Sequence, residues 1–204
     1  GRSHKIDHPN FTFIQCDLSE LGALEKMELS IPSGPVTLVN NAGIIGEIKR
    51  ISDQPKPDLN EVLALNTIAP LVLWNKIYQQ VSQKDEFVLV NISSGAANKA
   101  IPSWAAYCAS KAALNMLSET FYLEEKEKGN KPRVYAVSPG VIDTSMQSQI
   151  RNSSDADFSS VHNFIALKEN DELFSPEEAA NRLIKLLENS YNGEIFYDLR
   201  SVGS

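Results

Sequence analysis

Tyr107 and Lys111 are the two residues of this sequence whose types and spacing most clearly suggest acid–base chemistry. They lie four positions apart in a helix-like segment, so their side chains share one helix face about one turn apart. A phenol is a weak acid with a reference pKa of about 10, and a nearby ammonium group lowers that pKa because it favours the phenolate. Tyr107 could therefore donate a proton to a carbonyl oxygen. On the pair alone, an ordinary exposed helix contact is the alternative.

Small and polar residues follow three of the predicted strands. Because the carboxyl ends of parallel strands meet at one edge of a sheet, where ligands bind, we expect these residues to line one site. Small residues there would let a flat ligand approach closely. The residues are Ser94 after strand 87–92, Asn40-Asn41-Ala42-Gly43 at the end of strand 36–40, and Pro139-Gly140 after strand 133–137.

The elements that must position these residues alternate along the chain. Apolar runs predict strands, and apolar residues at helical spacing predict helices. Strands that alternate with helices imply right-handed crossovers, so the predicted fold class is α/β: a Rossmann-like, doubly wound parallel sheet covered on both faces. We predict strands at 11–15, 36–40, 87–92, 133–137 and 194–198, and helices at 58–78, 105–125 and 176–187.

Local signals refine three of these segments. Pro70 is expected to kink or divide the helix at 58–78. Ser175 is predicted to cap the helix that begins at Pro176. The stretch 144–174 is rich in Ser, Asn and Asp and carries no predicted element, so we expect a lid or a mobile loop there.

Length and composition exclude several classes of protein. A chain of 204 residues and 22.5 kDa that is 42% hydrophobic predicts one domain over 1–204. A net charge of −7 argues against nucleic acid or an anionic membrane as the partner, and no apolar run approaches the roughly 20 residues of a membrane span. Two cysteines are too few for a disulfide framework, so we expect a cytoplasmic protein. The three histidines show no ligand spacing, and no metal site is predicted.

The ordered set of motifs resembles the short-chain dehydrogenase/reductase family over residues 2 to about 198. Ser94 precedes Tyr107 by thirteen residues, and Asn66 lies in the helix with Pro70. The family motifs are Asn-Asn-Ala-Gly at 40–43, Tyr107-Cys108-Ala109-Ser110-Lys111, and the Pro-Gly turn at 139–140 with Thr144. Within the family the chain is most similar to the sepiapterin reductase branch, and there to the bacterial benzil reductases, through segments 46–50, 91–97, 104–108, 138–141 and 143–154.

The resemblance implies roles for four catalytic residues. Tyr107 would be the general acid, and Lys111 would lower its pKa and hydrogen-bond the nicotinamide ribose. Ser94 would hold the substrate carbonyl. Asn66 would anchor a water that relays protons to Lys111, whereas its alternative is a hydrogen bond to its own helix or to a neighbouring carbonyl.

The resemblance also implies NADPH, rather than NADH, as the cofactor. Arg2 matches the basic residue that pairs with the 2′-phosphate, and a guanidinium suits a phosphate. The alternative for Arg2 is a disordered terminal charge. The implied cofactor-binding residues are Arg2, Asp17 and Leu18 at the adenine, Asn40 on the adenosine side, Ala42 and Gly43 in the same motif, Tyr107 and Lys111 at the ribose, and Ile142 and Thr144 at the carboxamide.

The substrate side has two implied walls and one departure from the family. Trp104 and Met146 would line the pocket beside Ser94 and Tyr107, although both could be ordinary core residues. Sepiapterin reductases clamp the pteridine with an aspartate in the final strand, and Asp198 falls one residue out of register with it. A shift of one residue turns a strand side chain to the other face. Pteridine specificity therefore stays open.

The expected function is NADPH-dependent reduction of a small-molecule ketone or vicinal diketone. The alternative is a catalytically silent family member that senses cofactor or serves as a dimeric scaffold, but the chain retains both Tyr107 and Lys111. A serine hydrolase is disfavoured because the sequence has no Gly-x-Ser-x-Gly motif and no histidine placed as a base. Family members pair helices like 59–78 and 112–123 across a dimer axis, so the resemblance implies a homodimer or a tetramer.

One part of a dinucleotide site has no counterpart in the sequence. A glycine-rich turn between a first strand and a helix normally receives the pyrophosphate, and nothing here matches Gly-x-x-x-Gly-x-Gly. We expect the natural protein to be longer by a strand-helix-strand unit of about 30 or more residues. In the sheet, its strands would lie between those at 11–15 and 36–40.

Overall fold

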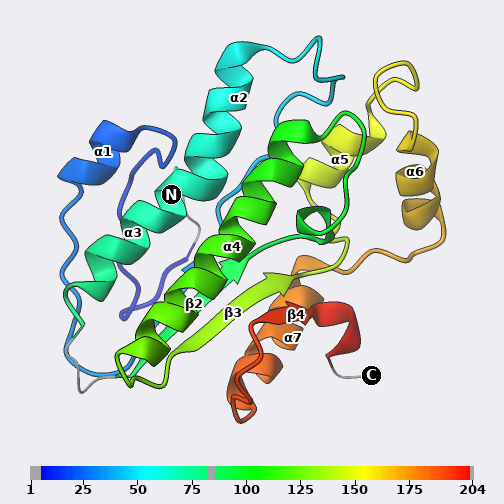
Figure 1. The fold of residues 1–204 in the computed structure, drawn as a ribbon. Helices are drawn as coiled ribbons and strands as arrows, with labels where there is room; N and C mark the ends of the chain where they lie inside the picture. The colour runs from blue at the N-terminus through cyan, green and yellow to red at the C-terminus, as the bar shows by residue number, and fades with distance from the viewer. Residues whose placement is uncertain (1–5, 82–85, 203–204) are drawn as a thin grey trace.

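Four parallel strands form the sheet in the computed structural model, which describes residues 6–81 and 86–202. The strand order is β1-β2-β3-β4, and each strand runs parallel to its neighbour (Figure 1). The bounds are Val36–Asn40 for β1, Phe87–Ile92 for β2, Arg133–Ser138 for β3 and Phe196–Asp198 for β4. The predicted α/β class with a parallel sheet is confirmed, and β4 is shorter than the predicted strand at 194–198.

Helices cover both faces of the two central strands. Helices α3 (Ala69–Tyr78) and α4 (Ala105–Glu127) pack on one face, and α7 (Pro176–Glu188) packs on the other. Side chains alternate along β2 and β3, and burial on both faces explains why these strands read as continuous apolar runs. One core contains Trp74, Leu89, Phe121, Val134 and Ala136, and the other contains Val88, Val90, Tyr135, Val137 and Leu186.

Strand β1 is covered less completely. Its Leu38 packs against the core on the α3–α4 face, whereas Thr37 and Val39 are exposed, with Val39 at 42%. Within the described residues, the predicted coverage of both faces therefore holds for β2 and β3 but not for β1.

The predicted helix at 58–78 is divided, as Pro70 indicated. Helix α2 (Lys56–Leu63) passes into a π-helical turn at Ala64–Ile68, and α3 follows. Pro70 has no N–H to donate to the carbonyl of Asn66, four residues earlier, so the α-helical bonding pattern cannot continue through this point. Short π-helical turns of this kind are frequent at functional sites.

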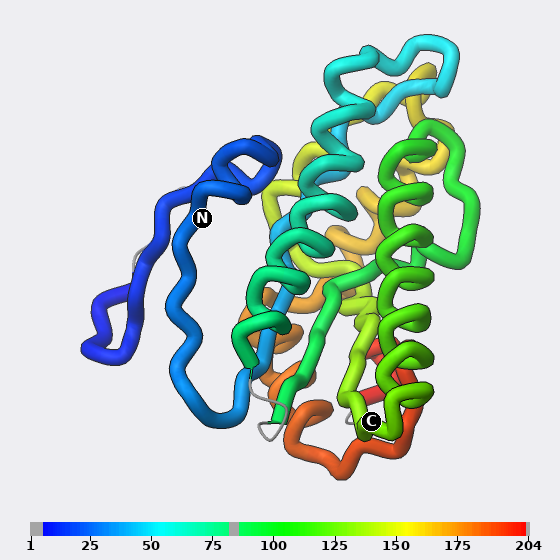
Figure 2. Tube along the Cα trace, turned by 60° about the vertical axis from the view of Figure 1, so that its left-hand side comes forward, coloured from blue at the N-terminus to red at the C-terminus, as the bar shows by residue number. Residues whose placement is uncertain are grey.

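The predicted strand at 11–15 is wrong. In the described part of the chain, these residues adopt no regular element. They lead into a short helix, α1 (Leu21–Lys26), which packs on α3 through Leu24 and Ala69. Figure 2 shows this N-terminal segment as an arm beside α3. A strand needs a partner for its backbone N–H and C=O groups, and β1 forms the end of the described sheet.

The prediction that 144–174 lacks secondary structure is also wrong. Helices α5 (Ser145–Arg151) and α6 (Val161–Glu169) occupy much of it. The ends of the segment are joined, because Phe174 N–H donates to Val141 O and Asp143 N–H donates to Phe174 O, each at 2.9 Å. Ser, Asn and Asp hid the helical spacing of the apolar residues that pack inward, which are Met146, Ile150, Val161, Phe164 and Ile165.

None of the helices in residues 6–81 and 86–202 is both long and apolar enough to cross a membrane.

Candidate active site

Ser94 stands immediately beyond β2, at the carboxyl edge of the sheet. The Ser93 N–H donates to Val137 O at 2.7 Å, which extends the β2–β3 pairing to the last residue before Ser94. Ser94 then caps a 3-10 turn at Gly95–Ala97, and its Oγ accepts a hydrogen bond from Ala96 N at 3.1 Å. The strand thus delivers a hydroxyl group to the edge where the sequence predicted it.

Tyr107 and Lys111 lie in the first two turns of α4, and both are buried. Tyr107 makes a side-chain hydrogen bond with Ser94. Lys111 Nζ donates to Ile92 O at 2.7 Å and lies 5.9 Å from the centre of the Tyr107 ring. The structure therefore brings Ser94, Tyr107 and Lys111 together, so the alternative of an exposed helix pair is wrong.

The pKa of Tyr107 differs in direction from the sequence prediction. Burial raises the pKa of its phenol above the usual 10.0, and the hydrogen bond with Ser94 acts in the opposite direction without cancelling it. Burial also lowers the pKa of Lys111 to about 8. The ammonium points at Ile92 O rather than at the phenol oxygen, so its effect does not overcome burial. Tyr107 is consequently held as a neutral phenol, the form that can donate a proton.

Asn66 lies in the π-helical turn with its side chain fully buried. Its Oδ1 accepts from Ile44 N at 2.9 Å, and its Nδ2 donates to Ile44 O at 2.8 Å and to Ser110 Oγ at 3.0 Å. The side chain therefore ties the loop after β1 to α4, which corresponds to the alternative of a bond to a neighbouring carbonyl. The water relay through Asn66 stays a prediction.

Gly43 lies in the loop after β1, close to Asn66 and Lys111. A Cβ at this position would lie 3.2 Å from Asn66 Oδ1 and 3.5 Å from Lys111 Nζ. Ala42 beside it is exposed. Asn40 is buried, and its Nδ2 donates to Asn91 Oδ1 at 2.8 Å, so its side chain links β1 to β2. The glycine thus allows the loop to pack tightly against Asn66 and Lys111, and Asn40, the first residue of the motif, has a structural role as well.

The other predicted cofactor residues lie on two segments and at the N-terminus. Ile142 forms a bridge with Phe174, and the exposed Thr144 occupies the N-cap position of α5. Asp17 Oδ1 accepts from Ser19 N at 3.0 Å, and Leu18 packs on the α1–α3 core. Arg2 lies outside the described residues. The cofactor roles of all these residues stay predictions.

An aromatic cluster adjoins Tyr107. Trp104 is buried and makes an edge contact with the Tyr107 ring, with centroids 5.8 Å apart. It stacks on Phe158 at 5.3 Å and contacts Phe164 at 5.4 Å, and Met146 packs against the same cluster. Trp104 is thus a core residue that also adjoins Tyr107, and the partly buried Met146 packs against the same core. The sequence analysis missed Phe158 and Phe164, whose signal was their aromatic type within an otherwise polar segment.

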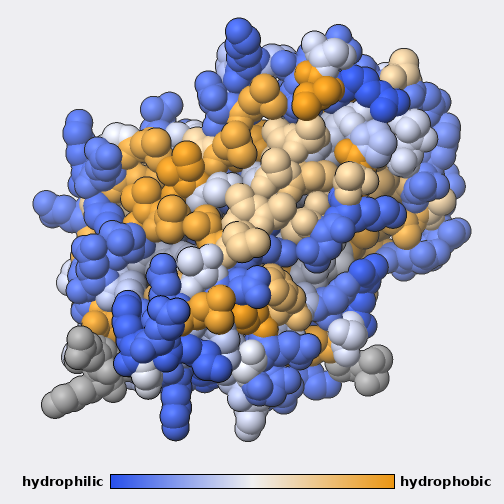
Figure 3. Space-filling view, in the orientation of Figure 1, coloured by the Kyte–Doolittle hydropathy of each residue, from blue (hydrophilic) through white to orange (hydrophobic). Residues whose placement is uncertain are grey.

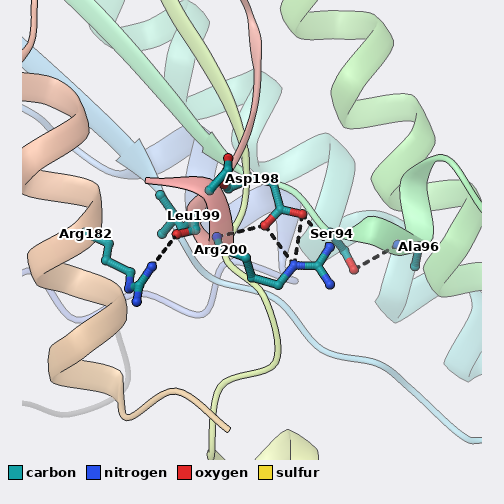
Figure 4. A network of polar contacts seen from close by, with 7 residues as sticks. Ser94, Ala96, Arg182, Asp198, Leu199 and Arg200 are labelled. Carbon is teal, nitrogen blue, oxygen red and sulfur yellow. Dashed lines mark hydrogen bonds and ion pairs between the residues drawn. The ribbon is translucent and has the colours of Figure 1, made fainter. Parts of the chain in front are cut away.

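Asp198 and Arg200 form an ion pair at the same edge, which the sequence analysis also missed. Arg200 Nε lies 3.0 Å from both carboxylate oxygens of Asp198, and Nη2 bonds to Oδ2 as well. Arg200 lies on a 3-10 turn, Leu199–Ser201, directly after β4. The hydrogen bonds of Arg200 hold the pKa of Asp198 below its usual value. Figure 4 shows the guanidinium pointing toward the turn that carries Ser94.

Comparisons with known proteins agree with this arrangement. The model of the short chain dehydrogenase family matches residues 3–155. Benzil reductase ((S)-benzoin forming) of Bacillus subtilis is 35% identical over 205 residues, which cover 96% of this chain and 84% of the relative. Sepiapterin reductase of Bos taurus is 34% identical over 179 residues, covering 85% of this chain and 61% of the relative.

Solved structures show the same fold. The short-chain dehydrogenase/reductase YIR035C from Saccharomyces cerevisiae superposes with a TM-score of 0.76 at 25% identity, covering 92% of this chain and 76% of that chain. A 4-hydroxyisoleucine dehydrogenase complexed with NADH and succinate superposes with a TM-score of 0.62 at 26% identity, covering 91% and 76%. The sheet is thus of the Rossmann type, as predicted.

Proposed function

Because the chain belongs to the short-chain dehydrogenase family of oxidoreductases, we propose that it is an NADPH-dependent carbonyl reductase acting on a ketone or vicinal diketone. The observation that carries the proposal is that the half-buried Ser94 hydrogen-bonds the buried Tyr107, with the buried Lys111 one helical turn away. The names of the similar proteins, benzil reductase and sepiapterin reductase, support a carbonyl substrate.

The residues around Gly43 support a nicotinamide cofactor. A Cβ at Gly43 would lie 3.2 Å from Asn66 Oδ1 and 3.5 Å from Lys111 Nζ, so glycine lets the loop after β1 pack closely against the ammonium that would hold the ribose. Lys111 would hold this ribose, with Ile142 and Thr144 at the carboxamide and Asp17 and Leu18 at the adenine. When bound, the cofactor supplies a hydride to the carbonyl carbon.

Ser94 and Tyr107 supply the remaining chemistry in this proposal. The Ser94 hydroxyl, presented beside Tyr107, holds the carbonyl oxygen of the substrate. Tyr107 donates its phenolic proton to that oxygen, which completes an alcohol. The ammonium of Lys111 stabilises the phenolate that remains, and general acid catalysis of this kind contributes about 10²–10⁴-fold. Asn66 acts by fixing the loop after β1 against α4.

The aromatic cluster supports an aromatic substrate. Trp104 places a flat apolar ring next to Tyr107, and the buried Phe158 stacks on Trp104 behind it; aromatic rings pack favourably against each other. A diaryl diketone would find apolar contacts there and a hydroxyl pair for its carbonyl.

The proposal also covers the oligomeric state of the protein and its cellular compartment. Exposed apolar side chains on α3 and α4 support a homodimer in which these helices pair. They are Leu71 on α3 and Met116 and Leu123 on α4, and Ile68 in the π-helical turn just before α3 is exposed as well. Figure 3 shows hydrophobic side chains gathered over this face. Cys16 and Cys108 are free thiols, which supports a reducing compartment such as the cytoplasm.

The test is NADPH oxidation with benzil, other diketones and sepiapterin, comparing the protein with Tyr107→Phe. Removal of the proton donor is expected to lower kcat by about 10²–10⁴-fold while NADPH still binds. NADH in place of NADPH measures the cofactor preference. Equal rates for the two proteins would contradict the role of Tyr107. Tight NADPH binding without turnover on any carbonyl compound would favour a silent, cofactor-sensing protein.

A further inference from the structure

We propose that Arg200 determines substrate specificity by occupying the Asp198 carboxylate, so that the site accepts uncharged aromatic carbonyl compounds and disfavours cationic ones. The inference rests on the proposed function, because it concerns the substrate end of the same site. The proposal has three requirements. The Asp198–Arg200 ion pair must lie at the substrate end of the site, the fold must fix the position of Arg200, and Arg200 must neutralise the charge of Asp198.

The pair lies on the strand edge that carries Ser94. Asp198 is the register partner of Ser138 in β3, and Ser138 Oγ lies 3.9 Å from where a Cβ of Gly95 would stand. Gly95 follows Ser94 directly. A Cβ at Gly140, just past β3, would lie 3.2 Å from Arg200 Cγ. Adjacent positions on three neighbouring strand ends therefore connect the pair to the catalytic serine, as Figure 4 shows.

The turn Leu199–Ser201, which carries Arg200, is anchored to α7 and to the core beneath the sheet. Arg182 Nη1 on α7 donates to Leu199 O and to Val202 O, each at 3.0 Å. Leu199 is buried in the core between the sheet and α7. Ser201 Oγ donates to Asp198 O at 2.7 Å. With both ends of the turn anchored, the position of Arg200 is set by the fold rather than by its own exposed side chain.

Arg200 uses the whole carboxylate of Asp198. The Arg200 N–H donates to Oδ1 at 2.9 Å, and the guanidinium contacts both oxygens. A forked contact of this kind matches the geometry of a carboxylate. The pair carries no net charge, and a cationic substrate group would have to displace the guanidinium to reach Asp198. With Arg200 removed, the same carboxylate would attract a cation.

The experiment measures binding rather than turnover. Benzamidine serves as a cationic aromatic probe, and benzamide is its uncharged match. Each is titrated by NMR at low ionic strength against the protein, against Arg200→Met and against the double variant Asp198→Asn/Arg200→Met. The natural protein is expected to bind benzamidine no more tightly than benzamide. Arg200→Met is expected to bind benzamidine about 10-fold more tightly, and salt should weaken this gain because the new attraction is ionic.

The double variant is the matched control. It lacks the carboxylate as well, so the gain for benzamidine is expected to disappear while benzamide binding matches that of Arg200→Met. If Arg200→Met does not fold, Arg200→Gln retains length and polarity and carries the same expectation. Unchanged benzamidine binding after loss of Arg200 would overturn the proposal. So would benzoate binding that Arg200→Met weakens more than benzamide binding, because Arg200 would then be an anion receptor.

The two proposals can fail separately. Absence of turnover on all carbonyl compounds, together with the expected benzamidine gain, would reject the reductase and retain the specificity role of Arg200. Turnover of benzil without the tighter benzamidine binding of Arg200→Met would retain the reductase function and reject the specificity role of Arg200.

Discussion

Lys111 is the residue whose buried state has the clearest energetic consequence. Only 4% of it is exposed, and its described hydrogen bond is to the carbonyl of Ile92. Burial disfavours the ammonium, so the folded protein binds this proton less tightly than the unfolded chain does. A lysine proposed to act in catalysis thus lowers the stability of the folded protein.

Lys111→Met is expected to raise the free energy of unfolding at pH 7. The pKa of Lys111 is about 8 when folded, against 10.5 for an ordinary lysine. The unfolded chain therefore binds more protons between these values, and the stability of the natural protein rises with pH there. The stability of the variant does not rise in this way. Its free energy of unfolding therefore exceeds that of the natural protein by at most about 3 kcal/mol, and this difference shrinks above pH 8. Urea unfolding at several pH values between 7 and 10 measures it.

Lys99→Met provides the control for this experiment, because Lys99 is an exposed lysine of the same sheet edge. Its effect on stability is expected to stay small and constant across the range. An advantage of Lys111→Met that does not change with pH would show that the lysine keeps its ordinary proton affinity in the folded protein.

Sequence reasoning identified Ser94, Tyr107 and Lys111 because strand ends and helix spacing fix where such residues meet. It could not identify Arg200 or Phe158. These two reach the site from segments distant in the chain, and their positions depend on how β4 and α6 pack. The direction of the Tyr107 pKa was also unpredictable, since burial and the orientation of the ammonium are tertiary properties.

At the scale of elements, Glu125 joins the ends of α3 and α4. It is 2% exposed and accepts hydrogen bonds from Tyr78 Oη, Lys128 Nζ and Asn130 Nδ2 at 2.5, 2.7 and 2.6 Å. Burial acts to raise the pKa of its carboxyl, but these hydrogen bonds and the Lys128 charge outweigh burial and leave the pKa below its usual 4.5. The carboxylate thus links α4, the helix that carries Tyr107 and Lys111, to the end of α3.

Glu125→Gln is expected to lower the free energy of unfolding by about 1–3 kcal/mol at pH 7, because buried donors lose a charged acceptor. The depressed pKa adds stability that is present above the unfolded pKa and is lost as pH falls through the folded pKa. The difference between the natural protein and the variant should therefore close below about pH 4.5. Urea unfolding from pH 7 to 3 measures it, with the exposed neighbour Glu124→Gln as the control. A difference independent of pH would exclude an ionised Glu125.

Elements were predicted well where packing and periodicity agree. Strands β2 and β3 were found because burial on two faces gives apolar runs, and helix α4 because burial on one face gives a helical stripe. Strand β1 was found from its short apolar run, although only one of its faces is covered in the described part of the chain. Helices α5 and α6 were missed because their many polar residues obscured the helical spacing of the few apolar residues that pack inward. The strand expected at 11–15 has the right alternation, but alternation alone does not supply a hydrogen-bonding partner.

At the scale of the whole molecule, the outer surface of α3 and α4 is expected to be an interface between two copies. Met116 and Leu123 lie seven residues apart on α4, so they share one face, and they are 62% and 53% exposed. Met116→Lys would place a charge in the proposed interface and should convert a dimer to a monomer. Sedimentation velocity over a range of concentrations measures the change.

Ile184→Lys is the matched control, since Ile184 is an equally exposed apolar residue on α7, across the sheet from α3 and α4. This variant should remain dimeric. A natural protein that sediments as a monomer at all concentrations, or a dimer that both substitutions leave intact, would rule out this interface.

Among residues 6–81 and 86–202 no strand pairs with the outer edge of β1, and this should be visible in amide hydrogen exchange. The Val36 N–H donates to Glu86 O across to β2, and backbone groups alternate sides along a strand, so those of Leu38 and Asn40 also face β2. The amides of Thr37 and Val39 then face outward and should exchange with deuterium much faster than their neighbours. A strand that pairs with this edge would slow the exchange of Thr37 and Val39 but not that of their neighbours, so these two amides would report its docking.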